Sequence, residues 1–383
     1  MSIGTDDEPN TLAAAVADFC RKEVGTVAER DRLTDGGFEV HSPLIARKMA
    51  DLGWLGIAIP TEFGGSGGGL VDLCSFLDAA NHGLAPIGAY PTSAIVGSWY
   101  LRFGSPEQKA TILGGIAAGR VESLALSEPG SGSDVAGARC RADRIDDGFV
   151  LNGQKSWCSN AHLADHLLVL ARTDDTGDRH AGLTLFQVPA DAPGVEIRPI
   201  RSLAGAELNE VFLTDCHVPR SAVVGLVGQG WLQVMSGLTF ERLVISAAML
   251  GLARRAFDDV LQFVKEREQF GQPVGTFQAV RHRCADLATE LECCRLLVYD
   301  AARSADRDRS KLPPQRAAMV KLKVTETARR TTLEAMQLMG AAGVSSEYGL
   351  ERAARMALLS TIYGGTSEIQ RNILARQVLD LPG

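Results

Sequence analysis

The sequence predicts an α+β protein in three parts: a helical N-terminal part (1–120), a β-rich middle (121–230) and a C-terminal helical bundle (231–383). Two changes of hydrophobic period predict this order. Apolar residues recur at helical spacing near both ends of the chain, whereas short apolar runs separated by Pro, Gly and Asp fill the middle. The chain lacks the strand–helix alternation of a Rossmann dinucleotide domain, so that class is excluded.

The N-terminal part is predicted to consist of helices joined by polar loops. Residues 11–27 place Val16 and Phe19 among other apolar side chains at helical spacing, which indicates one buried face. The segment Ser105-Pro106-Glu107-Gln108 is typical of a helix start. Serine can cap the helix, proline fits the first turn, and Gln108 completes a capping box.

The middle part is predicted to hold short strands. Residues 149–151 run into Asn152-Gly153, a pair that favours a turn, and further apolar runs follow at 167–170, 183–188 and 210–213. Strands of this length and spacing indicate a compact antiparallel sheet or barrel. Helical spacing returns over 243–264, 281–303 and 317–339, and consecutive long helices of this kind form a bundle.

Composition excludes several classes of protein. The 39 Lys+Arg against 46 Asp+Glu give a net charge of −7, so no basic surplus exists for binding nucleic acid. No run of apolar residues approaches the roughly 20 that a membrane span needs. The N-terminus MSIGTDDEPN is acidic, unlike a signal peptide, and a cytoplasmic location is expected. The eight cysteines form no CxxC pair, which predicts reduced, mostly buried thiols.

Two polar segments stand out as candidate ligand sites. Residues 126–134 (LSEPGSGSD) are rich in glycine and small hydroxyls, which let backbone N–H groups approach an anion, although a plain tight loop has the same composition. The spacing fits neither a P-loop nor a Rossmann fingerprint. Residues 152–160 carry Trp157 beside small polar residues, where the ring is equally suited to pack on a planar ligand or to join the core.

Other constellations are weaker. His162 and His166 have helical i, i+4 spacing but no glutamate of a zinc-protease motif between them, so no metal site is expected. Ser127 and Ser133 lack an evident His and Asp pairing for a hydrolase triad.

Five segments, in order along nearly the whole chain, resemble the acyl-CoA dehydrogenases, flavoenzymes that desaturate acyl thioesters between Cα and Cβ. They are LSEPGSGSDVAG (126–137), NGQKSWCSNA (152–161), EREQFGQPVGTFQAV (266–280), MQLMGAAGVSSEYGLER (336–352) and the C-terminal TIYGGTSEIQRNILAR (361–376). The resemblance implies an N-terminal α-helical domain, a middle β-barrel and a C-terminal four-helix bundle, with FAD as cofactor.

The resemblance also implies which residues hold the flavin. Those of the middle domain are Leu126, Ser127, Gly132, Ser133, Trp157 and Ser159, with Ser159 placed near the reactive flavin nitrogen. Those expected to reach the cofactor of a neighbouring subunit are Arg267, Gln269, Phe270, Gln337, Gly340 and Ala341. Thr366 and Glu368 match contacts to the adenosine end. A site completed across subunits implies a homo-oligomer, usually a tetramer in this family.

The catalytic base departs from the commoner pattern. Many family members carry it in the signature as Tyr-Glu-Gly-Thr, but this chain has Gly364 at that place, which cannot take a proton. In isovaleryl-CoA and long-chain types the base comes from an earlier helix, and Phe240-Glu241-Arg242-Leu243-Val244 matches that segment. Glu241 is therefore the expected base, and an apolar pocket would raise its pKa to a useful value. The alternative is a solvated glutamate in the first turn of a helix.

The substrate is expected to contact Ser133, Arg242, Tyr363 and Gly365, and the backbone N–H of Gly364 is suited to bind the thioester oxygen. For Arg242 the alternative is a surface or interface ion pair. The expected reaction is FAD-dependent dehydrogenation of a short or branched acyl-CoA, with an electron-transfer flavoprotein as electron acceptor. Three alternatives stay open: an acyl or aminoacyl group on a carrier protein, a flavin oxidase or monooxygenase, and a silent subunit of a heteromeric enzyme.

Overall fold

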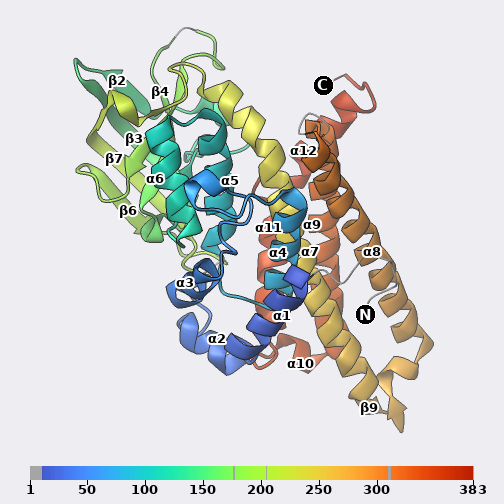
Figure 1. The fold of residues 1–383 in the computed structure, drawn as a ribbon. Coiled ribbons are helices and arrows are strands. Elements are labelled where there is room, and N and C mark those ends of the chain that lie inside the picture. The colour runs from blue at the N-terminus through green and yellow to red at the C-terminus, as the bar shows by residue number, and fades with distance from the viewer. Residues whose placement is uncertain (1–10, 176, 204, 309–311, 383) are drawn as a thin grey trace. The chain divides into compact units, whose positions relative to one another are not determined.

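The computed structural model describes residues 11–175, 177–203, 205–308 and 312–382, which fold into two compact units (Figure 1). Among the described residues, the helical unit contains those up to Gly37, Gly69–Ala85 and those from Glu241 onward. The sheet unit contains Phe38–Gly68 and Pro86–Phe240. The predicted N-terminal part therefore contributes to both units, because its helices pack partly on the bundle and partly on the sheet.

The helical unit contains the predicted bundle. Residues 243–264, 281–303 and 317–339 lie in three long helices, and α9 packs against α8, α11 and α12. The helices are α1 (Thr11–Glu23), α2 (Val27–Leu33), α4 (Leu70–His82), α7 (Gly230–Glu266), α8 (Gln278–Arg307), α9 (Pro314–Met339), α10 (Ala341–Val344), α11 (Leu350–Ser360) and α12 (Ser367–Gln377), of which α7 begins in the sheet unit.

Helix α7 is more apolar than the sequence analysis expected. By length and composition it is apolar enough to cross a membrane, with a mean hydropathy of 1.3 over its most apolar 18 residues. Of that window, 67 % is buried within the protein. Burial on most sides removes the polar face that a surface helix carries, which explains the high mean hydropathy of this window.

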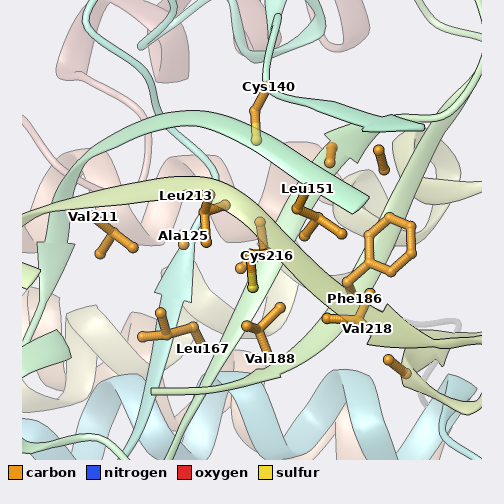
Figure 2. Packing of buried hydrophobic residues seen from close by; sticks show 14 of the residues in the cluster. Ala125, Cys140, Leu151, Leu167, Phe186, Val188, Val211, Leu213, Cys216 and Val218 are labelled. Atoms are coloured by element: carbon orange, nitrogen blue, oxygen red, sulfur yellow. The ribbon is translucent and has the colours of Figure 1, made fainter. Parts of the chain in front are cut away.

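The sheet unit is built on a mostly antiparallel sheet with the order β6-β7-β3-β2-β4-β5-β8, and β1 pairs in parallel with β4. Its strands curve around one apolar core that includes Leu151, Leu167, Phe186 and Val211 (Figure 2). The described elements are α3 (Pro43–Asp51), α5 (Ala89–Phe103), α6 (Pro106–Ala117), β1 (Glu122–Ala125), β2 (Arg141–Arg144), β3 (Gly148–Ser159), β4 (His166–Arg172), β5 (Leu183–Pro189), β6 (Val195–Pro199), β7 (Leu208–Pro219) and β8 (Val223–Val224).

The predicted helix start at Ser105 is confirmed. The Ser105 hydroxyl accepts a hydrogen bond from the Gln108 backbone N–H at 3.2 Å, and the Gln108 side chain accepts one from the Ser105 N–H at 3.0 Å. Pro106 is the first residue of α6. The capping box therefore forms as the sequence predicts.

The turn predicted at Asn152-Gly153 is wrong, because β3 continues through both residues and bulges there against β7. The Asn152 side chain bonds Asp215 on β7 twice, through the Asp215 N–H at 2.8 Å and through its own Nδ2 at 3.2 Å. A Cβ at position 153 would lie 2.8 Å from the Cα of Cys140. Glycine at this position therefore serves a close backbone approach rather than a chain reversal.

The cysteine prediction is confirmed: all eight thiols are free, and Cys293 alone is exposed. The helical spacing assumed for His162 and His166 is wrong. His162 lies in a short 3-10 turn, the left-handed Asn160 (φ 56°) comes just before that turn, and His166 starts β4. Among the described residues, no group of three or more His, Cys, Asp or Glu side chains is arranged to hold a metal ion.

Candidate active site

In the sheet unit, the loop at 126–134 is fixed by a buried ion pair. The loop leaves β1, and Glu128 within it accepts hydrogen bonds from the backbone N–H groups of Arg139 and Cys140 at 2.7 and 2.8 Å. Lys155 on β3 donates to Glu128 at 2.8 Å and to the Leu126 carbonyl at 3.1 Å. Burial opposes the charge of Glu128, but Lys155 and the two N–H donors outweigh it and lower the pKa of this carboxyl. Sequence reasoning did not single out Glu128 or Lys155, although both lie in the quoted segments.

The contacts of Glu128 with Lys155 and with the two N–H groups form an anchor for the loop, and the tip of the loop stays accessible to solvent. The Ser131 hydroxyl donates to the Asp134 carbonyl at 2.6 Å, which tightens the turn, while Gly132 and Ser133 are exposed. A Cβ built on Gly132 would meet no atom within 4 Å. The tip is thus ordered and accessible, as a ligand-binding loop requires.

Trp157 and Ser159 lie at the end of β3. Trp157 has φ +63°, which is strained for a residue other than glycine, and it exposes 57 % of its surface. It sits where the register of β3 against β7 shifts between Lys155 and Cys158. The bulge turns the indole out of the sheet, so Trp157 is a surface aromatic and the core alternative is excluded.

Glu207 is a residue that sequence reasoning missed. Its backbone carbonyl accepts from the Asn160 N–H at 2.6 Å, and Ser159 pairs with the adjacent Leu208 in the sheet. Burial raises the pKa of the Glu207 carboxyl to about 7, against a hydrogen bond from the Ser159 side chain that lowers it. The Ser159 hydroxyl is therefore oriented by a carboxyl that titrates near neutral pH, a contact that depends on strand pairing and has no signal in the sequence.

In the helical unit, Glu241 occupies the interior of α7. It lies about three turns from the start of the helix at Gly230, so the alternative of a first-turn glutamate is wrong. The side chain is half-buried, and burial raises its pKa, whereas the charges of Arg242 and Lys321 lower it. A carboxyl in this setting holds a proton more readily than an exposed glutamate does.

The signature segment turns beside that carboxyl. Gly364 and Gly365 both have left-handed backbones, with φ +64° and +82°. A Cβ built on Gly364 would lie 3.6 Å from Oε1 of Glu241. Thr366 then caps α12 by accepting from the Ile369 N–H at 3.3 Å. Tyr363 and Glu368 are exposed on either side of this turn, and Gly364 is the signature residue that the structure brings next to the Glu241 carboxyl.

Arg242 is buried rather than on the surface, with 5 % of its area exposed, so the surface ion pair is excluded. Burial lowers the pKa of its guanidinium, and the neighbouring charge of Glu241 raises it. Its Nε has no hydrogen-bond partner among the described residues. A buried, unpaired donor is costly, which suits a site that receives a ligand.

The remaining predicted contacts lie at the other end of α7. Arg267 follows the helix, and Gln269 and Phe270 belong to a hairpin of β9 (Glu268–Gln269) and β10 (Gln272–Pro273). The 25 residues from Glu241 to Glu266 span about 38 Å at helical rise. The structure therefore does not bring these residues to Glu241 within one chain. Gln337, Gly340 and Ala341 lie where α9 passes into α10, which Figure 1 places at the same end of the bundle as β9.

The chain belongs to the acyl-CoA dehydrogenase family. The family's N-terminal domain matches residues 6–120, its middle domain 123–216 and its C-terminal domain 228–379. The chain is thus an oxidoreductase of a family whose members bind FAD.

Among curated relatives, the 2-methylacyl-CoA dehydrogenase of Solanum tuberosum is 34 % identical over 384 residues, covering 98 % of this chain and 92 % of that protein. The isovaleryl-CoA dehydrogenase of the same plant is 35 % identical over 386 residues, with the same coverage. The solved acyl-CoA dehydrogenase of Geobacillus kaustophilus is 29 % identical, matches with a TM-score of 0.91 and covers 100 % of both chains.

The residues of the sheet unit fit FAD. An exposed indole is stabilised when a planar ring covers it, and Trp157 presents such a face next to Ser156, whose N–H donates to the Ser127 carbonyl of the loop at 2.9 Å. Leu126, Ser127, Gly132, Ser133, Trp157 and Ser159 would hold the cofactor on this unit. When bound, FAD supplies a two-electron acceptor for hydride.

Proposed function

We propose that this enzyme dehydrogenates a short or branched acyl thioester between Cα and Cβ, and that Glu241 removes the α proton. One observation carries the proposal: the Cβ position of Gly364 lies 3.6 Å from Oε1 of Glu241. The family's commoner base position and the carboxyl of Glu241 are thus neighbours. A glutamate on α7 reaches the region that a glutamate in the signature would occupy.

The proposed step conserves atoms and electrons. The Cα–H bond breaks and its proton goes to a carboxylate oxygen of Glu241. When FAD is bound it would accept the hydride from Cβ, and the electrons of the Cα–H bond would form the C=C bond. A base whose pKa is raised by burial holds the abstracted proton better, which favours the transfer. The backbone N–H of Gly364 is assigned to the thioester oxygen, where it would stabilise the charge that develops as the α proton leaves.

The acyl group is proposed from two related indications, both of them similarities to branched-chain enzymes. The relatives named above act by name on 2-methylacyl-CoA and isovaleryl-CoA, both short and branched. The placement of the base on α7 resembles the isovaleryl type. We assign the substrate contacts to Ser133, Arg242, Tyr363 and Gly365, the thioester carrier to CoA and the electron acceptor to an electron-transfer flavoprotein.

We further infer a homo-oligomer, with a tetramer as the expected form. Phe270, at the tip of the β9–β10 hairpin, exposes 92 % of its surface and has a left-handed backbone (φ +53°). An aromatic side chain held out in this way contributes to stability only when another surface covers it. Within one chain the hairpin follows the end of α7, about 38 Å along the helix from Glu241. The hairpin of one subunit would therefore contact the cofactor of a neighbouring subunit.

Anaerobic reduction of the bound flavin tests the function. Isovaleryl-CoA, 2-methylbutyryl-CoA, straight-chain acyl-CoAs and the same acyl groups on a carrier protein are titrated, and loss of oxidised-flavin absorbance is followed. We expect a branched acyl-CoA to reduce the flavin fastest. Glu241→Gln should lower the rate by about a thousandfold with the flavin content unchanged. Glu62→Gln changes an exposed carboxylate in the same way and should leave the rate intact.

Other outcomes identify the alternatives. Full reduction in Glu241→Gln would refute the assigned base. If carrier-protein thioesters reduce the flavin faster than acyl-CoAs do, the natural thioester carrier is a carrier protein rather than CoA. Rapid oxygen consumption during turnover would indicate an oxidase or monooxygenase. Flavin that binds only when a partner chain is present would indicate a silent subunit.

A further inference from the structure

Helix α9 carries a lysine with no exposed surface. The ammonium of Lys321 donates to the backbone carbonyl of Gly365 at 2.9 Å. Burying an ammonium is costly unless it is paired, and an apolar side chain of similar length fills such a space without that cost. A lysine at this buried position therefore points to a role for its charge or its hydrogen bond.

The hydrogen bond fixes the turn of the signature. Gln370 on α12 also donates to the Gly365 carbonyl, at 2.8 Å, and to the Gly364 carbonyl at 3.2 Å. Donors from two helices thus hold two consecutive glycines whose backbones are left-handed. Glycine loses more conformational freedom on ordering than other residues, so an unbraced Gly-Gly turn would sample many conformations. The brace keeps Gly364 beside the Glu241 carboxyl.

The charge of Lys321 acts on the same carboxyl. The charged groups that face the ammonium are Glu241 and Arg242 on α7, Glu368 on α12 and Glu326 on α9 itself. Burial lowers the pKa of Lys321 to about 8, while the three carboxylates raise it. The ammonium therefore still carries most of its charge at pH 7. In return, it lowers the pKa of Glu241, which burial raises.

We propose that Lys321 is a positioning residue for the Glu241 base, which it serves by bracing the Gly364–Gly365 turn and by placing one positive charge near the carboxyl. This inference rests on the proposed function of Glu241. Lys321 touches the turn rather than the substrate, so it acts through Glu241 and Gly364. Its two contributions are separable, because Gln370 shares the brace but carries no charge.

The pH profile of kcat/KM in Lys321→Met tests the charge. Without the ammonium, the ionised form of Glu241 loses a favourable partner, so the acid limb moves to higher pH. Each pH unit of movement lowers the rate below the limb about tenfold. Lys321→Arg, which keeps the charge, should restore the limb toward its original position. Gln370→Leu weakens only the brace, so kcat should fall while the limb stays in place.

A second readout needs no turnover. The folded-state pKa of about 8 lies below the ordinary value of 10.5, so between these pH values the unfolded chain binds more protons than the folded one. The free energy of unfolding should therefore rise with pH across this window. In Glu241→Gln the ammonium loses one carboxylate, its pKa falls further, and the rise should begin at lower pH. Urea unfolding of both proteins measures this, even if Lys321→Met does not fold.

An acid limb that stays in place in folded Lys321→Met, or a rise that begins at the same pH in Glu241→Gln and the wild type, would overturn the proposed charge effect. A kcat unchanged in Gln370→Leu would overturn the brace. Failure of the proposed function has a different signature, namely flavin reduction that persists in Glu241→Gln.

Discussion

Each unit of the molecule holds a glutamate near a buried lysine, and the pKa values of the two carboxyls are shifted in opposite directions. In the sheet unit, Lys155 donates directly to Glu128 at 2.8 Å, and the pKa of Glu128 is lowered. In the helical unit, Lys321 donates to a backbone carbonyl and acts on Glu241 through its charge alone, and the pKa of Glu241 is raised. The same two residue types therefore build a structural anchor in one unit and the proposed catalytic base in the other. The difference depends on the acceptor of the ammonium's hydrogen bond, which is the carboxylate of Glu128 in the sheet unit and the backbone carbonyl of Gly365 in the helical unit.

Breaking the anchor should have the largest effect. Lys155→Met leaves Glu128 buried without its cation, which costs about 3–5 kcal/mol of unfolding free energy at neutral pH. Because the lowered pKa of Glu128 stabilises the fold above its ordinary value of 4.5, the loss should shrink as the pH falls below 4.5. Urea denaturation at several pH values measures it. Arg198→Met removes the exposed pair with Glu196, which solvent screens, and should cost much less than Lys155→Met. An equal cost in both variants would contradict the comparison.

Moving the carboxylate back to the signature is the next test. Glu241→Gln with Gly364→Glu should stay nearly inactive, because position 364 has φ +64° and its Cβ would overlap Cδ1 of Ile245. Adding Ile245→Ala makes space, and the rate of flavin reduction should rise about tenfold or more over Glu241→Gln, or about 1.4 kcal/mol in activation free energy. Glu241→Gln with Ile245→Ala alone is the control. Full activity without the Ile245 change would show that the strain is unimportant.

The proposed base, Glu241, should lower the free energy of unfolding at neutral pH. A glutamate whose folded-state pKa is raised stabilises the fold fully below about 4.5 and loses that contribution as the pH rises through the raised value. Glu241→Gln should thus be more stable than the wild type at pH 7, by about 0.5–2 kcal/mol, and similar to it near pH 4. Thermal unfolding at both pH values measures the difference. A less stable variant at pH 7 would show that Glu241 is a structural residue.

The smallest effect is expected at Glu207. Its pKa of about 7 predicts that the Ser159 hydroxyl changes its hydrogen bonding between pH 6 and 8. The absorbance of bound flavin should show a small pH-dependent change over this range, which Glu207→Gln abolishes. Glu210→Gln, three residues along the same chain, is the control and should retain the change. A pH-independent spectrum in the wild type would place the cofactor away from Ser159.

Much of the fold was predictable because local signals agree with it. The capping box at Ser105, the change of period near 120 and the three long helices are each encoded within a few residues, and each is observed. The Asn152-Gly153 pair gave a wrong prediction, because the same dipeptide suits both a turn and a bulge. The close approach of the Cys140 backbone, which decides between the two, cannot be read from the dipeptide. Glu241 was predicted as the base from the missing glutamate at 364. Its surroundings were not predictable, because Lys321 lies 80 residues further on (321 − 241) and reaches the signature only through helix packing.

The thiols have a practical consequence. Burial raises the pKa of Cys20 and Cys158 to about 12, whereas Cys293 on α8 is exposed. A maleimide reacts with the thiolate, so labelling of the native protein should stop at one dye or spin label per chain. The wild-type sequence thus offers a single spectroscopic handle on α8, from which label-to-label distances between copies in solution become measurable without any mutation.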